Sequence, residues 1–147
     1  RAARHRRRHP PPGSPHAPVM IDDDPPESPR IALVGPCAAG KSTLSRALRA
    51  AGYNVRQPAQ EHSYVPNMWQ RLSRPDILIF LDLDFANLAR RHPHTHGGPA
   101  RLADQHQRLR HARAHSDFYL DTSDLTPEEV RTRVLAFLQE VLPSSSA

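Results

Sequence analysis

Residues 31–42 read Ile31-Ala32-Leu33-Val34-Gly35-Pro36-Cys37-Ala38-Ala39-Gly40-Lys41-Ser42, a short apolar run followed by a glycine-rich turn. Four consecutive apolar residues that end at a glycine are typical of a strand buried on both faces of a parallel sheet. After Lys41 the apolar residues recur at helical spacing, and Gly52 stands where a helix commonly ends. This stretch therefore predicts a strand, a tight loop and an amphipathic helix in direct succession.

The loop between this strand and helix has the composition of a phosphate-binding loop. Residues 35–42 fit G-x-x-x-x-G-K-[ST] at every fixed position, in the strand–loop–helix context that the motif requires. The alternative is a chance glycine-rich turn. That alternative does not explain why the one lysine of the chain, Lys41, stands at the position that demands lysine. We therefore expect the loop to bind a nucleoside triphosphate, ATP with Mg²⁺.

The positions in the loop each have a chemical reason. Small residues let the backbone approach the phosphates, and N–H groups at the start of a helix attract negative charge. Lys41 would neutralise the β- and γ-phosphates, the Ser42 hydroxyl would ligate Mg²⁺, and Thr43 would reach the α-phosphate. The expected nucleotide contacts are Gly35, Pro36, Cys37, Ala38, Ala39, Gly40, Lys41, Ser42 and Thr43.

Strand and helix patterns alternate along the rest of the chain. Further strands are predicted at 53–57, 77–81 and 118–120, and helices near 67–72 and at 85–91 and 101–115. Asp84 is placed to cap one helix, and a capping box at 126–129 begins a final helix that ends before Pro143. This alternation predicts a compact α/β domain of the P-loop NTPase type. It would have three layers, with a short parallel sheet of about four strands and helices on both faces.

Composition divides the chain into parts. Residues 1–29 hold eight of the sixteen prolines, no aromatic residue and five arginines, all within Arg1–Arg8. Such a segment has too little apolar surface to offset the entropy of ordering it. We predict a disordered tail at 1–29, a folded domain at 30–143 and a short disordered tail at 144–147. Met20 opens a less basic segment, so Arg1 and Met20 are both candidates for the start of the chain.

Charge and cysteine content narrow the class of protein. The formal net charge of +5 comes entirely from Arg1–Arg8, since basic and acidic residues balance from residue 21 onward. The high isoelectric point is therefore no argument for nucleic-acid binding. The single cysteine, Cys37, excludes an intramolecular disulfide, and no apolar run approaches the roughly 20 residues of a membrane span. We expect a soluble cytoplasmic protein without a membrane or nucleic-acid partner.

Three segments resemble kinases of the P-loop superfamily. IALVGPCAAGKSTLSRAL at 31–48 resembles the opening of cytidylate kinase, and PDILIFLDLDFANLARR at 75–91 resembles the approach to the lid of thymidylate kinase. FYLDTSDLTPEEV at 118–130 resembles the final strand and helix start of adenylylsulfate kinase. A GTPase is excluded, because its N-K-x-D motif needs a second lysine. The resemblance implies a small-molecule kinase that transfers the γ-phosphoryl group to an unidentified acceptor.

The resemblance also implies roles for residues outside the loop. Arg90 and Arg91, with Arg101 nearby, would surround the transferring phosphoryl group beside Lys41. Glu61 follows the second predicted strand and is either a base or substrate contact or a plain loop carboxylate. Asp82 ends an apolar run as a metal-binding aspartate does, and would help Ser42 to hold Mg²⁺; the alternative is a capping or structural role.

Departures from these families leave alternatives open. Only residues 53–75 are available for both an acceptor-binding region and a separate metal-site strand. A regulator or degenerate kinase that binds ATP without transferring phosphate is therefore the second hypothesis. Tyr64, Met68 and Trp69 would either stack on an acceptor or pack in the core. The histidines at 92–98 would form either a metal-binding tract or a solvated lid loop. The sequence indicates neither the acceptor nor the oligomeric state.

Overall fold

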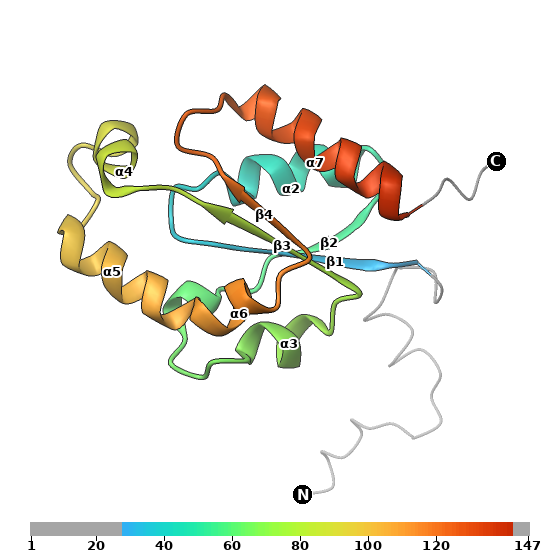
Figure 1. Ribbon diagram of the computed structural model, residues 1–147, viewed down its shortest axis with the longest axis horizontal. Helices are drawn as coiled ribbons and strands as arrows, with labels where there is room; N and C mark the ends of the chain where they lie inside the picture. Colours follow the sequence, from blue (N-terminus) through green and yellow to red (C-terminus); the bar gives the residue numbers. More distant parts are fainter. Residues whose placement is uncertain (1–27, 143–147) are drawn as a thin grey trace, which may run out of the picture.

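A parallel sheet lies at the centre of the molecule (Figure 1). The computed structural model describes residues 28–142, so the tails predicted at 1–29 and 144–147 lie outside the described residues, except for residues 28 and 29. The sheet has the strand order β2-β1-β3-β4. Its strands are β1 (Arg30–Val34), β2 (Asn54–Arg56), β3 (Ile77–Asp82) and β4 (Phe118–Asp121). In the register, Ala32 of β1 pairs with Arg56 of β2 and with Leu78 of β3.

Helices cover both faces of this sheet (Figure 1). On one face α2 (Lys41–Ala50) packs against α7 (Pro127–Val141). The opposite face carries α3 (Met68–Ser73), α5 (Gly98–Arg108) and α6 (Arg110–Ala114). Two short elements follow strand ends: the 3-10 turn η2 (Gln60–His62) after β2, and α4 (Phe85–Arg91) after β3. The predicted α/β architecture, a parallel sheet with helices on both faces, is confirmed.

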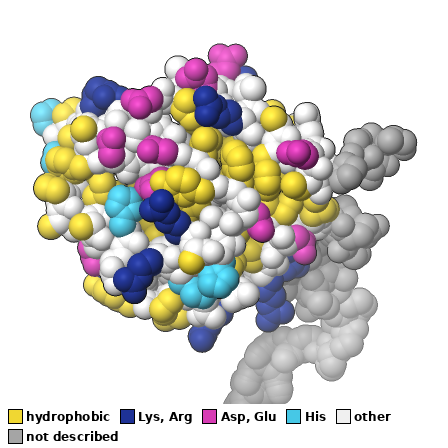
Figure 2. All heavy atoms as spheres, viewed as in Figure 1, with side chains coloured by type: hydrophobic (Ala, Val, Ile, Leu, Met, Phe, Trp, Pro, Cys, Tyr) yellow, Lys and Arg dark blue, Asp and Glu magenta, His cyan; other side chains and the backbone are white. Residues whose placement is uncertain are grey.

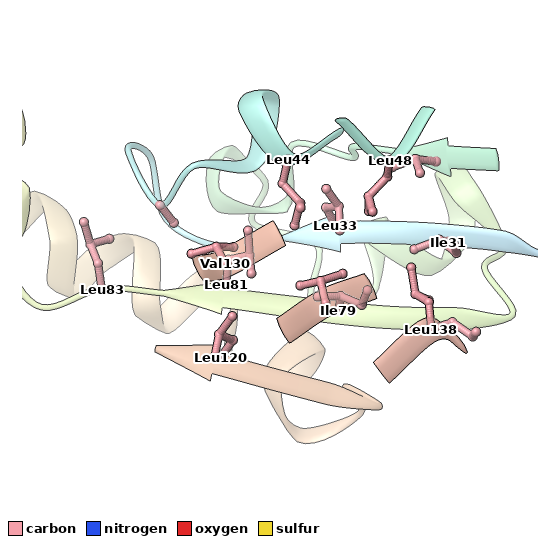
Figure 3. Packing of buried hydrophobic residues seen from close by; sticks show 14 of the residues in the cluster. Ile31, Leu33, Leu44, Leu48, Ile79, Leu81, Leu83, Leu120, Val130 and Leu138 are labelled. Carbon is pink, nitrogen blue, oxygen red and sulfur yellow. The ribbon is translucent and has the colours of Figure 1, made fainter. Parts of the chain in front are cut away.

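The core has two parts because side chains alternate across the sheet. Ile31 and Leu33 of β1 and Ile79 of β3 point toward α2 and α7, where they meet side chains such as Leu48 and Leu138 (Figure 3). The other set of β1 and β3 side chains packs with residues of α3 and α6 in a smaller cluster: Ala32, Val34, Trp69, Leu78, Phe80, Leu109 and Ala112. Burial on both faces explains why the sequence of these strands is an unbroken apolar run.

The predicted helix ends are confirmed by their hydrogen bonds. The Asp84 carboxylate accepts from the backbone N–H of Asn87 at 2.9 Å, and this bond holds the pKa of Asp84 below its usual value. The Thr126 hydroxyl accepts from Glu129 N–H, while the Glu129 carboxylate accepts from Thr126 N–H, which completes the capping box. Gly52 adopts φ 96° and ends the α2 turn. The strand boundaries agree with prediction to within a residue or two.

One prediction is wrong in detail. The single helix expected at 101–115 begins earlier, at Gly98, and is interrupted at Leu109. Leu109 has ψ 0°, whereas a regular helix has ψ near about −42°. Its side chain is completely buried in the smaller cluster. The pattern of polar and apolar residues does not depend on such a local change in ψ, so the break at Leu109 could not be predicted from the sequence.

The strand order indicates at which edge of the sheet a ligand is expected to bind. From β1 the chain passes first to β2 on one side and then to β3 and β4 on the other. In open parallel sheets, ligands bind outside the carboxyl ends of the strands at the point where this reversal occurs. That point lies between β1 and β3, where residues 35–40 leave β1. Within residues 28–142, none of the helices is long and apolar enough to cross a membrane.

Candidate functional site

The loop that leaves β1 has a backbone conformation that its small residues allow. We refer to residues 35–42 as the glycine-rich loop. Gly35 has φ 152°, and a Cβ atom at this position would lie 1.9 Å from the backbone oxygen of Leu81 in β3. Ala38 and Gly40 also have positive φ, 70° and 96°. Gly40 stands at the N-cap of α2, so the loop turns directly into the first turn of that helix.

Lys41 is buried at the base of this loop. Its ammonium donates to the backbone oxygens of Gly35 at 2.6 Å and Pro36 at 2.9 Å. It also lies 3.2 Å from the Glu61 carboxylate, and both side chains are only 7% exposed. The three N–H bonds of an ammonium thus have three partners. Lys41 is folded back under the loop and holds the ends of β1 and β2 together.

Glu61 is the buried acidic partner of this lysine. It stands in η2, a few residues after the end of β2, and its carboxylate lies near the loop because parallel strands end at one edge of the sheet. Its Oε2 atom contacts Lys41, whereas its buried Oε1 atom has no hydrogen-bond partner among the described residues. An unpartnered buried carboxylate oxygen is costly, and it is commonly satisfied by water, a ligand or an ion.

A cavity of about 600 Å³ runs along the glycine-rich loop. This volume lies within the range typical of small-molecule sites. One wall consists of the loop and the start of α2, where Ser42 and Thr43 are exposed. Gln57, which follows β2, donates to the Ser42 hydroxyl at 3.2 Å. A second, more apolar wall is formed by Thr122, Leu125, Pro127 and Val130, and the Thr122 hydroxyl donates to the Ala39 oxygen of the loop at 3.4 Å.

Arg91 and Arg90 occupy different positions. Arg91 lines the cavity and joins its two walls, because its guanidinium donates to the backbone oxygens of Ala38 at 2.8 Å and Thr122 at 2.6 Å. Arg90 donates to the side chain of Asn87 and is not among the described residues that line the cavity. The structure therefore brings Arg91, Glu61 and Lys41 together at the loop, and leaves Arg90 and Arg101 outside this cavity.

Asp82, predicted either as a metal ligand or in a structural role, lies in a network away from the larger cavity. Its carboxylate contacts His106 at 2.8 Å and accepts from the Tyr119 hydroxyl at 2.6 Å, with Arg113 at 4.0 Å. Burial and this hydrogen bond raise the pKa of Tyr119 well above its usual range. Asp82 does not line the cavity beside the glycine-rich loop. Of its two predicted roles, the contacts favour the structural one, in which Asp82 ties β3 to α5 and β4.

A second, smaller cavity adjoins the larger one at Cys37, Ala38 and His92. It has a volume of about 140 Å³ and is lined by residues of α4, α5 and the segment between them, together with Cys37 and Ala38. Gln105 of α5 reaches the loop here: its amide oxygen accepts from the Cys37 backbone N–H at 3.0 Å, and its Nε2 lies 3.4 Å from Cys37 Sγ. Cys37 and Ala38 of the loop thus line both cavities.

Neither the protein-family models nor the curated proteins include a match to this chain. The assignment of the site therefore depends on its geometry and on the chemistry of its residues.

The remaining predicted site residues lie elsewhere. Trp69 is buried in the smaller core cluster, and its indole N–H donates to His111 at 3.1 Å. Tyr64 is 80% exposed and lies under the Arg108 guanidinium. His92 and His96 line the smaller cavity, and His96 also accepts from Gly98 N–H. Among residues 28–142, the histidines at 92–98 do not converge with other metal ligands.

Several residues at the site were not predicted. Gln57, His62 and Gln105 contact the glycine-rich loop, and Leu125 and Val130 line the apolar wall. Gln57 and His62 both follow β2, and the parallel arrangement of the strands was the one indication that they would reach the loop. Nothing in the sequence indicates that Gln105 contacts the loop, because it lies 68 residues along the chain from Cys37.

Proposed function

We propose that this protein binds a nucleoside triphosphate, ATP with Mg²⁺, in the larger cavity, as a member of the P-loop NTPase class. The observation that carries the proposal is the placement of the glycine-rich loop. The loop lies at the point where strand order reverses, opens into the first turn of α2, and lines a cavity of about 600 Å³. Backbone N–H groups in such a loop and the positive end of a helix are a general means of binding phosphate.

The two walls of the cavity suit the two ends of a nucleotide. The triphosphate would lie along residues 38–43, with the exposed Ser42 hydroxyl as a ligand of Mg²⁺. The base would lie against Leu125, Pro127 and Val130, since apolar side chains favour a flat ring. The Arg91 guanidinium spans the gap between these ends and would face the phosphates.

Lys41 would have to change partners when the triphosphate binds. In the structure its ammonium is held by two backbone oxygens and by Glu61. A triphosphate carries several negative charges and would compete for the same three donors, because charge-assisted bonds to phosphate are stronger than bonds to neutral carbonyls. Release of Lys41 would leave the Glu61 carboxylate available as a base or as a contact for a hydrated metal ion.

Phosphoryl transfer to a small molecule is the activity that we favour for this site. Transfer depends mostly on positioning and charge neutralisation, which Lys41, Arg91 and Mg²⁺ would supply. The smaller cavity beside the loop is the candidate acceptor site, since it shares Cys37, Ala38 and His92 with the larger cavity. The second candidate function is nucleotide binding without transfer. The position of Asp82 favours this second function, because Asp82 lies outside the larger cavity. Among the described residues, Glu61 is the one carboxylate that lines this cavity.

An assay of ADP release separates these two functions. With Mg·ATP alone, release is expected to be slow, and the correct acceptor from a panel of nucleosides, nucleotides and phosphorylatable metabolites should accelerate it sharply. Glu61→Gln should reduce the accelerated rate far more than it reduces ATP affinity, whereas Arg90→Ala should change both little, because Arg90 lies outside the cavity. If no acceptor accelerates release, nucleotide binding without transfer is the better description.

A further inference from the structure

Three metal-ligating side chains converge beside the glycine-rich loop. The Cys37 thiol belongs to the loop, and Glu61 and His62 belong to η2. Cys37 Sγ lies 3.7 Å from His62 Nε2, and His62 Nε2 lies 3.7 Å from Glu61 Oε2. One ligand atom from each residue lies within 4.8 Å of the other two. Among residues 28–142 this is the one group of three or more such side chains with this spacing.

We propose that Cys37, Glu61 and His62 form a binding site for a thiophilic divalent cation such as Zn²⁺. Zinc binds thiolate sulfur at about 2.3 Å and imidazole nitrogen or carboxylate oxygen at about 2.0–2.2 Å. Tetrahedral geometry then requires ligand atoms to lie about 3.3–3.6 Å apart. The two measured separations exceed this range by little, and the third, between Cys37 and Glu61, is at most 4.8 Å, so rotation of the side chains would bring the ligands to bonding distance.

The donor set distinguishes this site from the Mg²⁺ position at Ser42. Magnesium prefers six oxygen ligands and keeps much of its water, whereas a thiolate with an imidazole and a carboxylate selects zinc or a similar transition metal. With three protein ligands, the fourth coordination position would be open to water or to a ligand. His62 is 51% exposed, so a cation could reach the site from solvent. The site does not depend on nucleotide binding.

Glu61 supplies the second observation in favour of a cation. Its buried Oε1 atom has no hydrogen-bond partner among the described residues, and the side chain as a whole is only 7% exposed. The other oxygen, Oε2, lies near both Lys41 and His62, so the carboxylate would turn to bring Oε1 to the metal while Oε2 keeps the lysine. The negative charges of the Cys37 thiolate and Glu61 would also offset the repulsion between Lys41 and the cation.

Occupancy of this site would join the glycine-rich loop to the end of β2. Cys37 is in the loop and lines both cavities, while Glu61 and His62 are carried by η2. Gln105 supports the arrangement, because it contacts both the Cys37 backbone N–H and the sulfur. Such outer contacts commonly orient a metal ligand. A bound cation would stabilise the folded protein, since it binds the native arrangement of the three residues.

Cobalt titration of the full chain, without nucleotide, tests the proposal. Co²⁺ substitutes for Zn²⁺, and Cys37 is the one cysteine of the chain, so a thiolate-to-cobalt charge-transfer band would report on this residue alone. We expect one Co²⁺ per chain, absorption typical of tetrahedral coordination, displacement by equimolar Zn²⁺ and a rise in melting temperature. A large excess of Mg²⁺ should not displace the cobalt.

Variants identify the other two ligands. His62→Ala should weaken Co²⁺ binding by about 100-fold or more, and this half-exposed side chain can be removed without loss of folding. Cys37→Ser should abolish the charge-transfer band, and Glu61→Gln should weaken binding. His94→Ala, an exposed histidine in the segment between α4 and α5, is the matched control and should leave the titration unchanged. The proposal is overturned if no band appears, if His62→Ala binds as wild type does, or if the complex contains two chains per metal.

Discussion

Gly35 is the residue whose side chain the fold most strictly excludes. Replacing it by alanine would place a Cβ atom 1.9 Å from the Leu81 oxygen in β3, in addition to the strain of φ 152°. Gly40 also has positive φ, but a Cβ atom added there would have no neighbouring atom within 4 Å. Gly35→Ala is therefore expected to lower the free energy of unfolding by about 3 kcal/mol or more, against about 1–2 kcal/mol for Gly40→Ala.

Urea unfolding of both glycine variants measures this difference. The slope of the free energy of unfolding against urea concentration should be the same in both variants, which would show that their unfolded states are comparable. Equal destabilisation by the two substitutions would show that the contact between the loop and β3 is not tight.

At the scale of single residues, the sequence predicts local chemistry better than it predicts partners. The motif identifies Lys41 and Ser42, because their spacing is fixed within one loop. It does not reveal that Lys41 is paired with Glu61, or that Cys37 lies beside His62, since those contacts depend on how β1 and β2 pair. Asp82 shows that the position of a residue in the sequence does not determine its contacts. Its position at the end of an apolar strand suggests a metal ligand, whereas its contacts are with His106 and Tyr119.

The capping box of α7 gives a test at the scale of a secondary-structure element. Thr126 accepts from Glu129 N–H at 3.1 Å, and α7 packs against α2 through the larger core cluster. Thr126→Ala is expected to reduce the free energy of unfolding by about 1 kcal/mol, since one N–H at the helix start loses its partner. Thr132→Ala, at an exposed position within the same helix, should be neutral or slightly stabilising because alanine favours helix. Chemical denaturation that gave the same result for both variants would contradict a role for the cap.

Elements were predictable where their signals are local. The buried strands, the Asp84 cap and the Thr126 capping box each depend on a few adjacent residues, and the structure confirms them. The order β2-β1-β3-β4 could not be inferred, because all four strands pair in parallel and no tight hairpin turn fixes which strands are neighbours. The break at Leu109 was missed for the related reason that tertiary packing, rather than spacing, determines it.

For the whole molecule, the folded part carries a modest positive formal charge. Residues 28–142 hold 15 basic and 11 acidic residues, a difference of +4, because Asp22, Asp23, Asp24 and Glu27 lie before them. Figure 2 shows basic and acidic side chains interspersed over one face, without a continuous positive area. The buried core residues lie between Ile31 and Leu138. Deletion of residues 1–27 is therefore expected to leave the melting temperature unchanged within error. A clear fall in melting temperature would show that these residues pack on the described part of the chain.

The central claim is that the glycine-rich loop binds the triphosphate through Lys41. Isothermal titration calorimetry with Mg·ATP tests it directly, on the wild-type chain, on Lys41→Ala and on Arg46→Ala, which removes an exposed charge from the same helix. We predict one site per chain, a loss of about 1.5–3 kcal/mol of binding free energy in Lys41→Ala, equivalent to a roughly tenfold to hundredfold rise in Kd, and little change in Arg46→Ala. Circular dichroism should show that both variants remain folded. Unchanged Mg·ATP affinity in folded Lys41→Ala, or no binding by the wild-type chain, would contradict the account.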